Sequence, residues 1–155
     1  TAQFDTRPKI KEIFTRQRCS PPGGYFEKGI NKNACDTLLL HESKILLLFG
    51  GNTCSQCVIK NIMDLNLISD RIGKDKIIIA GDFADRRAFE NYLSKIPYSG
   101  FKHILFQDII NLSDIEIKVP IILLLDTNYS IKLLFFDYKE NSFERDLLFS
   151  RLINM

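Results

Sequence analysis

Tryptophan is absent from this chain, and so is any run of about 18 apolar residues, the length that crosses a bilayer as a helix. The basic residues are scattered, and a net charge of +2 is too small to indicate a nucleic-acid or membrane-surface partner. Internal repeats and low-complexity tracts are missing as well. We therefore expect neither a membrane-spanning helix nor a nucleic-acid partner.

Cysteine is scarce too, with four residues at Cys19, Cys35, Cys54 and Cys57. A zinc site built from thiolates usually needs two close pairs, and only Cys54 and Cys57 form one. The sequence therefore argues against zinc, and nothing in it implies a bound cofactor. Cys19 and Cys35 fit a second disulfide as well as they fit two ordinary thiols, so both interpretations stay open.

Apolar residues make up 45% of the 155 residues and include twelve phenylalanines, enough for a core without disulfide scaffolding. The first 35 residues differ from the rest in their Pro and Gly content, and one short helix is predicted there at 8–18. We expect residues 1–35 to form an arm or lid that packs on a main domain of residues 36–155. The chain starts on Thr1 rather than Met. This fits removal of an N-terminal leader from a secreted or membrane-tethered protein, and it fits a chain boundary equally well.

From residue 36 onward, apolar runs typical of buried strands alternate with segments of helical periodicity. Strands are predicted at 36–40, 44–49, 77–80, 102–107, 121–125 and 131–136, the last two as a hairpin. Helices are predicted from the Cys54–Cys57 pair to near Gly73, over 84–95 with Asp82 as its cap, and over 142–153. This order predicts an α/β fold with a central mixed β-sheet and helices on both of its faces.

The two later helices each carry a face that we expect to enter the core. In the first helix and the residue before it, these side chains are Phe83, Phe89, Tyr92 and Leu93. In the last helix they are Phe143, Leu147, Leu148 and Leu152.

The segment Cys54-Ser55-Gln56-Cys57 carries the chemistry of the chain. It follows the strand at 44–49 and the helix breakers Gly50-Gly51-Asn52, and it opens the next helix. Two cysteines three apart at a helix start lie on one face, close enough to form a small disulfide ring. Unpaired backbone N–H groups and the positive end of the helix dipole stabilise a thiolate at Cys54. The pattern indicates a dithiol redox centre.

The remaining polar residues suggest no second site. His41 and His103 are far from the cysteine pair in sequence, and we interpret them as loop or strand-end residues rather than catalytic bases. Asp82, Asp85 and the Arg86-Arg87 pair are interpreted as decoration of an exposed helix start, with no argument for a metal.

The arrangement resembles the thioredoxin fold, and more closely the thiol–disulfide oxidoreductases of the bacterial envelope, the TlpA/ResA-like branch. The resemblance covers roughly residues 36–155 and rests on the Cys-x-x-Cys segment after a strand, the terminal hairpin and helix, and Val119-Pro120 before the hairpin. The family keeps a cis-proline at that last position. The segment 83–107 looks like the helix-plus-strand insertion of this branch. The resemblance implies a three-layer α/β sandwich of the thioredoxin type.

By this resemblance, Cys54 is the exposed nucleophile that attacks a substrate disulfide, and Cys57 is the thiol that resolves the mixed disulfide. Thr53, Val119 and Pro120 are implied to contact the substrate. The implied partners are protein thiols or disulfides and a redox partner protein. A monomeric state and an extracytoplasmic location in a bacterial periplasm or envelope are expected, with a cytoplasmic location as the open alternative.

The chain departs from the family at two positions beside the motif. Thr53 stands where the family usually has an aromatic residue, often tryptophan. Leu48 lies six residues before Cys54, where general reductases of this fold carry a buried acid. Without that acid, deprotonation of Cys57 is expected to lack its usual relay. Two neutral residues between the cysteines, Ser55 and Gln56, predict an intermediate reduction potential.

Two classes of function remain open from the sequence. One is a thiol–disulfide oxidoreductase, which the intact cysteine pair favours. The other is a binding module that docks a partner through Val119-Pro120 and the N-terminal arm with little redox turnover, which Leu48 and Thr53 favour. A peroxidase is disfavoured, because the active cysteine of peroxiredoxins sits in a Pro-x-x-x-Thr/Ser-x-x-Cys motif, whereas Gly50-Gly51-Asn52-Thr53 precedes Cys54 and no such proline is present.

Overall fold

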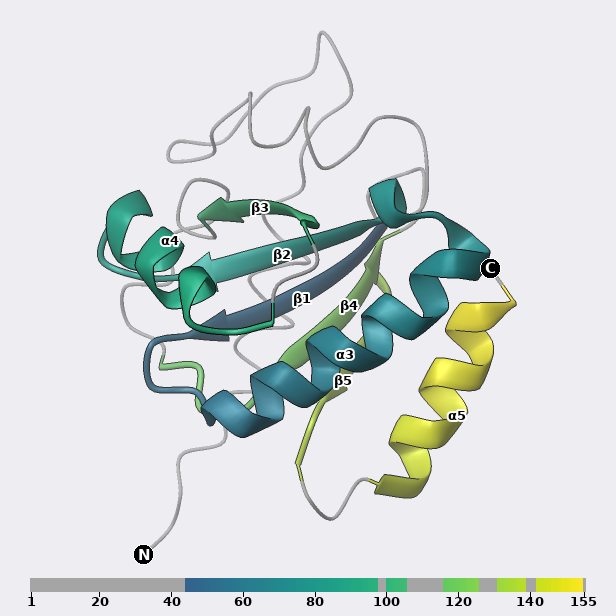
Figure 1. Cartoon of the computed structure of the whole chain (residues 1–155). Helices are drawn as coiled ribbons and strands as arrows, with labels where there is room; N and C mark the ends of the chain where they lie inside the picture. Colours follow the sequence, from purple (N-terminus) through teal and green to yellow (C-terminus); the bar gives the residue numbers. More distant parts are fainter. Residues whose placement is uncertain (1–43, 98–99, 106–115, 126–130, 139–141, 155) are drawn as a thin grey trace, which may run out of the picture.

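The computed structural model describes residues 44–97, 100–105, 116–125, 131–138 and 142–154. Figure 1 shows a central β-sheet with helices across it. The elements, in chain order, are β1 (Lys44–Gly50), α3 (Ser55–Ile72), a short 3-10 turn η1 (Lys74–Lys76), β2 (Ile77–Asp82), α4 (Arg86–Ser94), β3 (Lys102–Leu105), β4 (Ile121–Leu125), β5 (Ile131–Phe136) and α5 (Ser142–Ile153). The arm at 1–35, the predicted strand at 36–40, His41, Cys19 and Cys35 lie outside the described residues.

The sheet has five strands in the order β3-β2-β1-β4-β5. β1 pairs in parallel with β2, which pairs in parallel with β3, whereas β4 is antiparallel to both β1 and β5. The predicted mixed sheet and the terminal hairpin are therefore confirmed. β1 lies in the centre and is buried along its whole length, which explains its uninterrupted apolar sequence.

The three described helices pack on one face of the sheet and share one core with it, so the helical layer predicted for the second face is not among the described residues. On the sheet, alternate residues such as Ile45, Leu47 and Phe49 of β1 supply this core. The helices contribute Val58, Ile62, Leu65, Ile68 and Ile72 from α3, Phe89 and Leu93 from α4, and Leu148 and Leu152 from α5. Each such side chain contributes roughly 1.5–3 kcal/mol when it leaves water. In Figure 1, α3 and α5 lie side by side across this face.

The start of α4 differs from the prediction. Asp85, not Asp82, caps the helix, because the Asp85 carboxylate accepts a hydrogen bond from the backbone N–H of Ala88 at 2.8 Å. Asp82 instead ends β2, where it pairs with Gly50 of β1. Strand pairing thus extends two residues past the predicted end of the strand and delays the helix.

The boundaries of α5 are those predicted, but its inward face is not. Phe143 is 71% exposed and Leu147 is 53% exposed, whereas Arg145, Leu148 and Leu152 are buried. These three residues are spaced i, i+3 and i+7 and so share one side of the helix. Carboxylates on α3 and after β5 bind the Arg145 guanidinium, and this compensates for burying its charge. None of the described helices has the length and apolarity needed to cross a membrane.

Candidate active site

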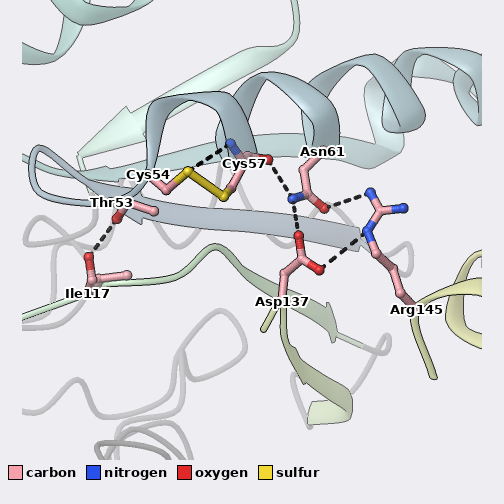
Figure 2. Close-up of a disulfide and its surroundings, with 7 residues drawn as sticks. All are labelled: Thr53, Cys54, Cys57, Asn61, Ile117, Asp137 and Arg145. Atoms are coloured by element: carbon pink, nitrogen blue, oxygen red, sulfur yellow. Dashed lines mark hydrogen bonds and ion pairs between the residues drawn. A yellow bond between two sulfur atoms is a disulfide. The ribbon is translucent and has the colours of Figure 1, made fainter. Parts of the chain in front are cut away.

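A disulfide joins Cys54 and Cys57 at the start of α3, just after the turn that follows β1, as Figure 2 shows. Cys54 is the N-cap of α3 and is exposed, whereas Cys57 is half-buried in the first turn. The sulfur of Cys54 accepts a hydrogen bond from the backbone N–H of Cys57 at 3.3 Å. The expected close pair at a helix start is therefore present, and the sulfur that solvent can reach is the one that caps the helix.

Thr53 braces the turn that carries Cys54. Its hydroxyl donates to the carbonyl oxygen of Ile117 at 2.6 Å and accepts from the backbone N–H of Gly50 at 2.9 Å. Its side chain is buried. The resemblance implied that Thr53 contacts the substrate, whereas the structure places its side chain inside the protein with its hydroxyl bonded within the chain.

A second link joins the same two segments at the surface. The Asn52 side-chain amide donates to the Glu116 carboxylate at 3.0 Å. Together with the bond from Thr53 to Ile117, it fixes the cysteine turn against the segment that leads to Val119-Pro120.

Val119 and Pro120 lie at the same end of the sheet as the disulfide. Pro120 is buried and Val119 is half-buried, directly before β4, whose first residue Ile121 pairs with Leu48 of β1. No cis peptide bond occurs among the described residues, so the bond before Pro120 is trans and the cis-proline expected from the resemblance is not found. The trans form is the lower-energy isomer even before proline, by about 0.5–1 kcal/mol.

Leu48 is fully buried and offers no proton relay from β1, as its sequence position implied. A polar cluster on the sheet-facing side of α3 lies close to Cys57 instead (Figure 2). The Asn61 amide donates both to the carbonyl oxygen of Cys57 at 2.8 Å and to the Asp137 carboxylate at 2.7 Å. Sequence reasoning missed this cluster entirely.

Arg145 closes the cluster from α5. Its Nε lies 3.4 Å from Oδ1 of Asp137, and its Nη2 donates to the Asn61 side-chain oxygen at 3.2 Å and to the carboxylate of Asp64. The side chains of Arg145 and Asp137 are only 9% and 11% exposed, so both charges sit in a weakly hydrated region. One guanidinium serves two carboxylates, which leaves one net negative charge when both acids are ionised.

Two signals in the sequence point to these residues in hindsight. Asn61 interrupts the apolar stripe of α3, three residues after Val58 and four before Leu65, and is fully buried. Arg145 interrupts the corresponding stripe of α5, three residues before Leu148. A polar side chain within an apolar stripe needs a buried partner, although its identity cannot be read from the stripe.

Asp82 is a second acid near the turn, on the β2 side. Burial raises the pKa of its carboxyl group above the ordinary 3.8 because the charged form loses hydration. A Cβ placed on Gly50 would lie 3.7 Å from the Asp82 Cβ and 3.9 Å from that of Ile117, so Asp82 flanks the base of the turn.

His103 lies on β3 and is not brought to the disulfide. Its ring contacts Phe89, and its Nε2 is 3.8 Å from Glu90. Within the described ranges, no group of three His, Cys, Asp or Glu side chains could hold a metal ion.

Comparison with known proteins supports the architecture at the level of structure. No family model matches the sequence, and no curated protein matches it significantly. A solved structure provisionally named the thiol:disulfide interchange protein DsbE, from Chlorobium tepidum, superposes with a TM-score of 0.50 at 13% identity, covering 76% of this chain and 83% of that one.

Two further structures align less closely. They are thioredoxin peroxidase I of Plasmodium yoelii, at 16% identity with 76% and 74% coverage and a TM-score of 0.46, and a cysteine variant of PrxQ from Xylella fastidiosa, at 11% identity with 72% and 77% coverage and a TM-score of 0.41. The fold rests on the first match together with the five-stranded mixed sheet and the three described helices. The chain therefore has a thioredoxin-like α/β fold.

Proposed function

We propose that this protein is a thiol–disulfide oxidoreductase whose redox centre is the Cys54–Cys57 pair. The observation that carries the proposal is the exposed Cys54 sulfur at the N-cap of α3, bonded to a half-buried partner one turn further on. In the reduced protein, the orphan N–H groups of the helix start stabilise a thiolate at Cys54. The second sulfur is shielded from direct attack and stays within reach of the first.

The reaction is two successive exchanges. The Cys54 thiolate attacks one sulfur of a substrate disulfide, a mixed disulfide forms, and the other substrate sulfur leaves as a thiolate. Cys57 then loses its proton and attacks the Cys54 sulfur, so that the Cys54–Cys57 bond forms and the second substrate thiolate leaves. The substrate gains two electrons and the cysteine pair loses two. The same steps in reverse oxidise a dithiol substrate.

Val119 and Pro120 are the proposed substrate contacts. They lie at the same end of the sheet as the disulfide and are tied to the cysteine turn through the bond from Thr53 to Ile117. An extended segment of a partner protein placed there would present its disulfide to Cys54. We assign Thr53 the task of holding the turn and the Val119-Pro120 segment in register.

The partners follow from this chemistry. We propose protein thiols or disulfides as substrates, a separate redox protein that resets the pair, and no cofactor. The neighbour from Chlorobium tepidum carries the name of a thiol:disulfide interchange protein, which supports the same reaction class. A location in the bacterial envelope, where disulfides persist, and a monomeric state complete the proposal.

The competing function is a binding module that docks partners without turnover. Leu48 favours it, because β1 supplies no carboxylate to deprotonate Cys57. The cluster of Asn61, Asp137 and Arg145 close to Cys57 favours the enzyme, since a buried carboxylate is present from another strand.

Equilibration of the pair with glutathione or dithiothreitol separates the two functions. An oxidoreductase is expected to exchange reversibly, with a potential between about −270 and −120 mV. Cys54→Ser should abolish disulfide reduction, and Cys57→Ser should trap partners as mixed disulfides, whereas Ser150→Ala, an exposed position in α5, should leave both unchanged. A pair that never exchanges, with Cys54 alkylated no faster than a free thiol, would leave only the binding module.

A further inference from the structure

We propose that Asp137 is the proton acceptor of Cys57, held beneath it by Asn61 and Arg145, in place of the carboxylate that β1 lacks at Leu48. The inference rests on the proposed redox function, because it assigns the source of the thiolate for the second exchange. It assigns a role to a residue that lies eighty positions after Cys57 and outside the motif.

The first argument is geometric. Asn61 follows Cys57 by four residues, so its side chain lies one helical turn below it on the same side of α3. A single amide nitrogen, Nδ2 of Asn61, bonds both the carbonyl oxygen of Cys57 and Oδ2 of Asp137. In Figure 2 the Cys57 sulfur and the Asp137 carboxylate lie on the same side of α3. Reduction frees the Cys57 thiol to meet this carboxylate, directly or through one water.

The second argument concerns how firmly the carboxylate is held. The backbone N–H of Asp137 donates to the carbonyl oxygen of Pro120 at 2.9 Å, which anchors it at the end of the hairpin. Nε of Arg145 forms an ion pair with Oδ1 at 3.4 Å without a hydrogen bond to a described residue, whereas Oδ2 accepts the hydrogen bond from Asn61 of α3. Asn61 and Arg145 are thus positioning residues, and a proton acceptor at this place needs no rearrangement of the fold.

The third argument is electrostatic. Among the described residues, the charged groups that contact Asp137 are Arg145 from α5 and, through Arg145, Asp64 from α3. With both acids ionised, the cluster carries one negative charge, which disfavours a thiolate at Cys57 while the pair waits for substrate. When the proton moves from Cys57 to Asp137, the cluster becomes neutral and the negative charge moves to the sulfur. No additional charge is created in the weakly hydrated site.

The step balances as follows. Cys57 transfers its proton to Asp137, and the resulting thiolate attacks the Cys54 sulfur of the mixed disulfide. The Cys54–Cys57 bond forms, the bond to the substrate sulfur breaks, and that sulfur leaves with the electron pair. The proton on Asp137 then passes to solvent or to the leaving thiolate. In the reverse direction, the Cys54–Cys57 bond breaks, Cys57 leaves as a thiolate, and protonated Asp137 returns the proton to that sulfur.

The test measures the two exchanges separately in the full chain. The reduced protein is mixed with 5,5′-dithiobis(2-nitrobenzoate), and the Cys54 adduct is followed by acid quench and peptide mass spectrometry, which separates it from reaction at Cys19 or Cys35. Formation of the adduct reports attack by Cys54, and its decay reports attack by Cys57. Asp137→Asn is expected to leave formation unchanged within about twofold and to slow decay at least about tenfold at pH 7, as expected for loss of general-base catalysis. At about pH 9.5 the difference should disappear, because a thiol with an ordinary pKa near 8.5 ionises without help.

Two control variants sharpen the result. Asp70→Asn removes an exposed carboxylate of the same helix, thirteen residues beyond Cys57 and outside the Arg145 cluster. Asp82→Asn removes the acid on the far side of the turn. Both should leave adduct decay within about twofold of the wild type. Equal slowing by Asp70→Asn and Asp137→Asn, slowing by Asp82→Asn alone, or no slowing by Asp137→Asn would overturn the inference.

A measurement on the wild type decides the matter if Asp137→Asn does not fold. With an internal proton acceptor, the logarithm of the decay rate should rise with pH by less than about half a unit per pH unit between pH 6 and 8. A slope of one over this range means that solvent alone takes the proton and refutes the inference. Adduct formation at the rate of a free thiol would instead refute the proposed function itself.

Discussion

Replacement of Arg145 by alanine should destabilise the protein by about 3.5–4 kcal/mol. The guanidinium binds two carboxylates, of which Asp137 is 11% and Asp64 is 30% exposed, and it stacks 4.6 Å from the centre of the Phe149 ring. Breaking a buried ion pair by removing one partner costs roughly 3–5 kcal/mol, because the other charge stays buried without compensation. Asp64 regains water more easily than Asp137, which favours the lower end of that range. The lost contact with the ring adds about 0.5–1 kcal/mol.

The assay is urea unfolding of the disulfide-bonded protein followed by circular dichroism at 222 nm, since the chain has no tryptophan to report by fluorescence. The midpoint should fall while the slope of free energy against urea stays constant. Arg151→Ala, an exposed arginine in the same helix, is the matched control and should change stability by less than about 0.5 kcal/mol. The double variant Arg145→Ala, Asp137→Asn should lose less than the sum of the single losses, because the orphan charge is then gone. A loss below about 1 kcal/mol for Arg145→Ala would refute the reasoning.

Three further substitutions test the packing around the site. Thr53→Val keeps the shape of the side chain but leaves the Ile117 carbonyl and the Gly50 N–H unpaired. It should lower the free energy of unfolding in urea by about 2 kcal/mol and slow alkylation of Cys54, whereas Thr53→Ser should do neither. Equal behaviour of the two variants would contradict the bracing role. Gly81→Ala should lower the free energy of unfolding by about 1–3 kcal/mol, because its Cβ would lie 2.5 Å from the buried Phe89 ring. Gly51→Ala is the control, since its Cβ would have no neighbour closer than 3.7 Å, and it should lower stability much less. Similar urea midpoints for the two variants would refute this prediction. Burial raises the pKa of Asp82, so the folded protein holds that proton more tightly than the unfolded chain and loses stability as pH rises above about 3.8. Asp82→Asn should therefore be more stable than the wild type at pH 7 and equal to it at pH 3. A variant that is less stable than the wild type at pH 7 would contradict this direction of the pKa shift.

The elements that the sequence predicted well are those whose signals are local. The hairpin strands Ile121–Leu125 and Ile131–Phe136 and the helix Ser142–Ile153 have the predicted bounds, because an apolar run or a helical period is visible within each segment. The Cys54–Cys57 pair was found for the same reason, since its spacing and its place between strand and helix are contained in about ten residues.

The cap of α4 was wrong because local signals competed. Asp82 and Asp85 are equally suitable caps by residue type, and only the pairing of Asp82 with Gly50, thirty-two positions earlier in the chain, decides between them. The inward face of α5 was wrong for a similar reason. Phe143 and Leu147 are more apolar than Arg145, but the partners that allow Arg145 to be buried come from α3 and from the residue after β5.

The departures from the family at Leu48 and Thr53 share a structural compensation, which bears on whether the cysteine pair is catalytically active. At both positions the residue lacks the group that the resemblance implied. Two long-range bonds, one made by Thr53 and the other by Asn61 rather than Leu48, connect the cysteine turn and the start of α3 to the hairpin half of the sheet. Thr53 ties the turn to Ile117, and Asn61 ties the first turn of α3 to Asp137. The two bonds attach at the same open end of the hairpin, one before β4 and one after β5, where the backbone N–H of Asp137 donates to the carbonyl oxygen of Pro120. A redox centre fixed in this way has its carboxylate supplied by the hairpin, so the absence of an acid in β1 is no argument against catalysis.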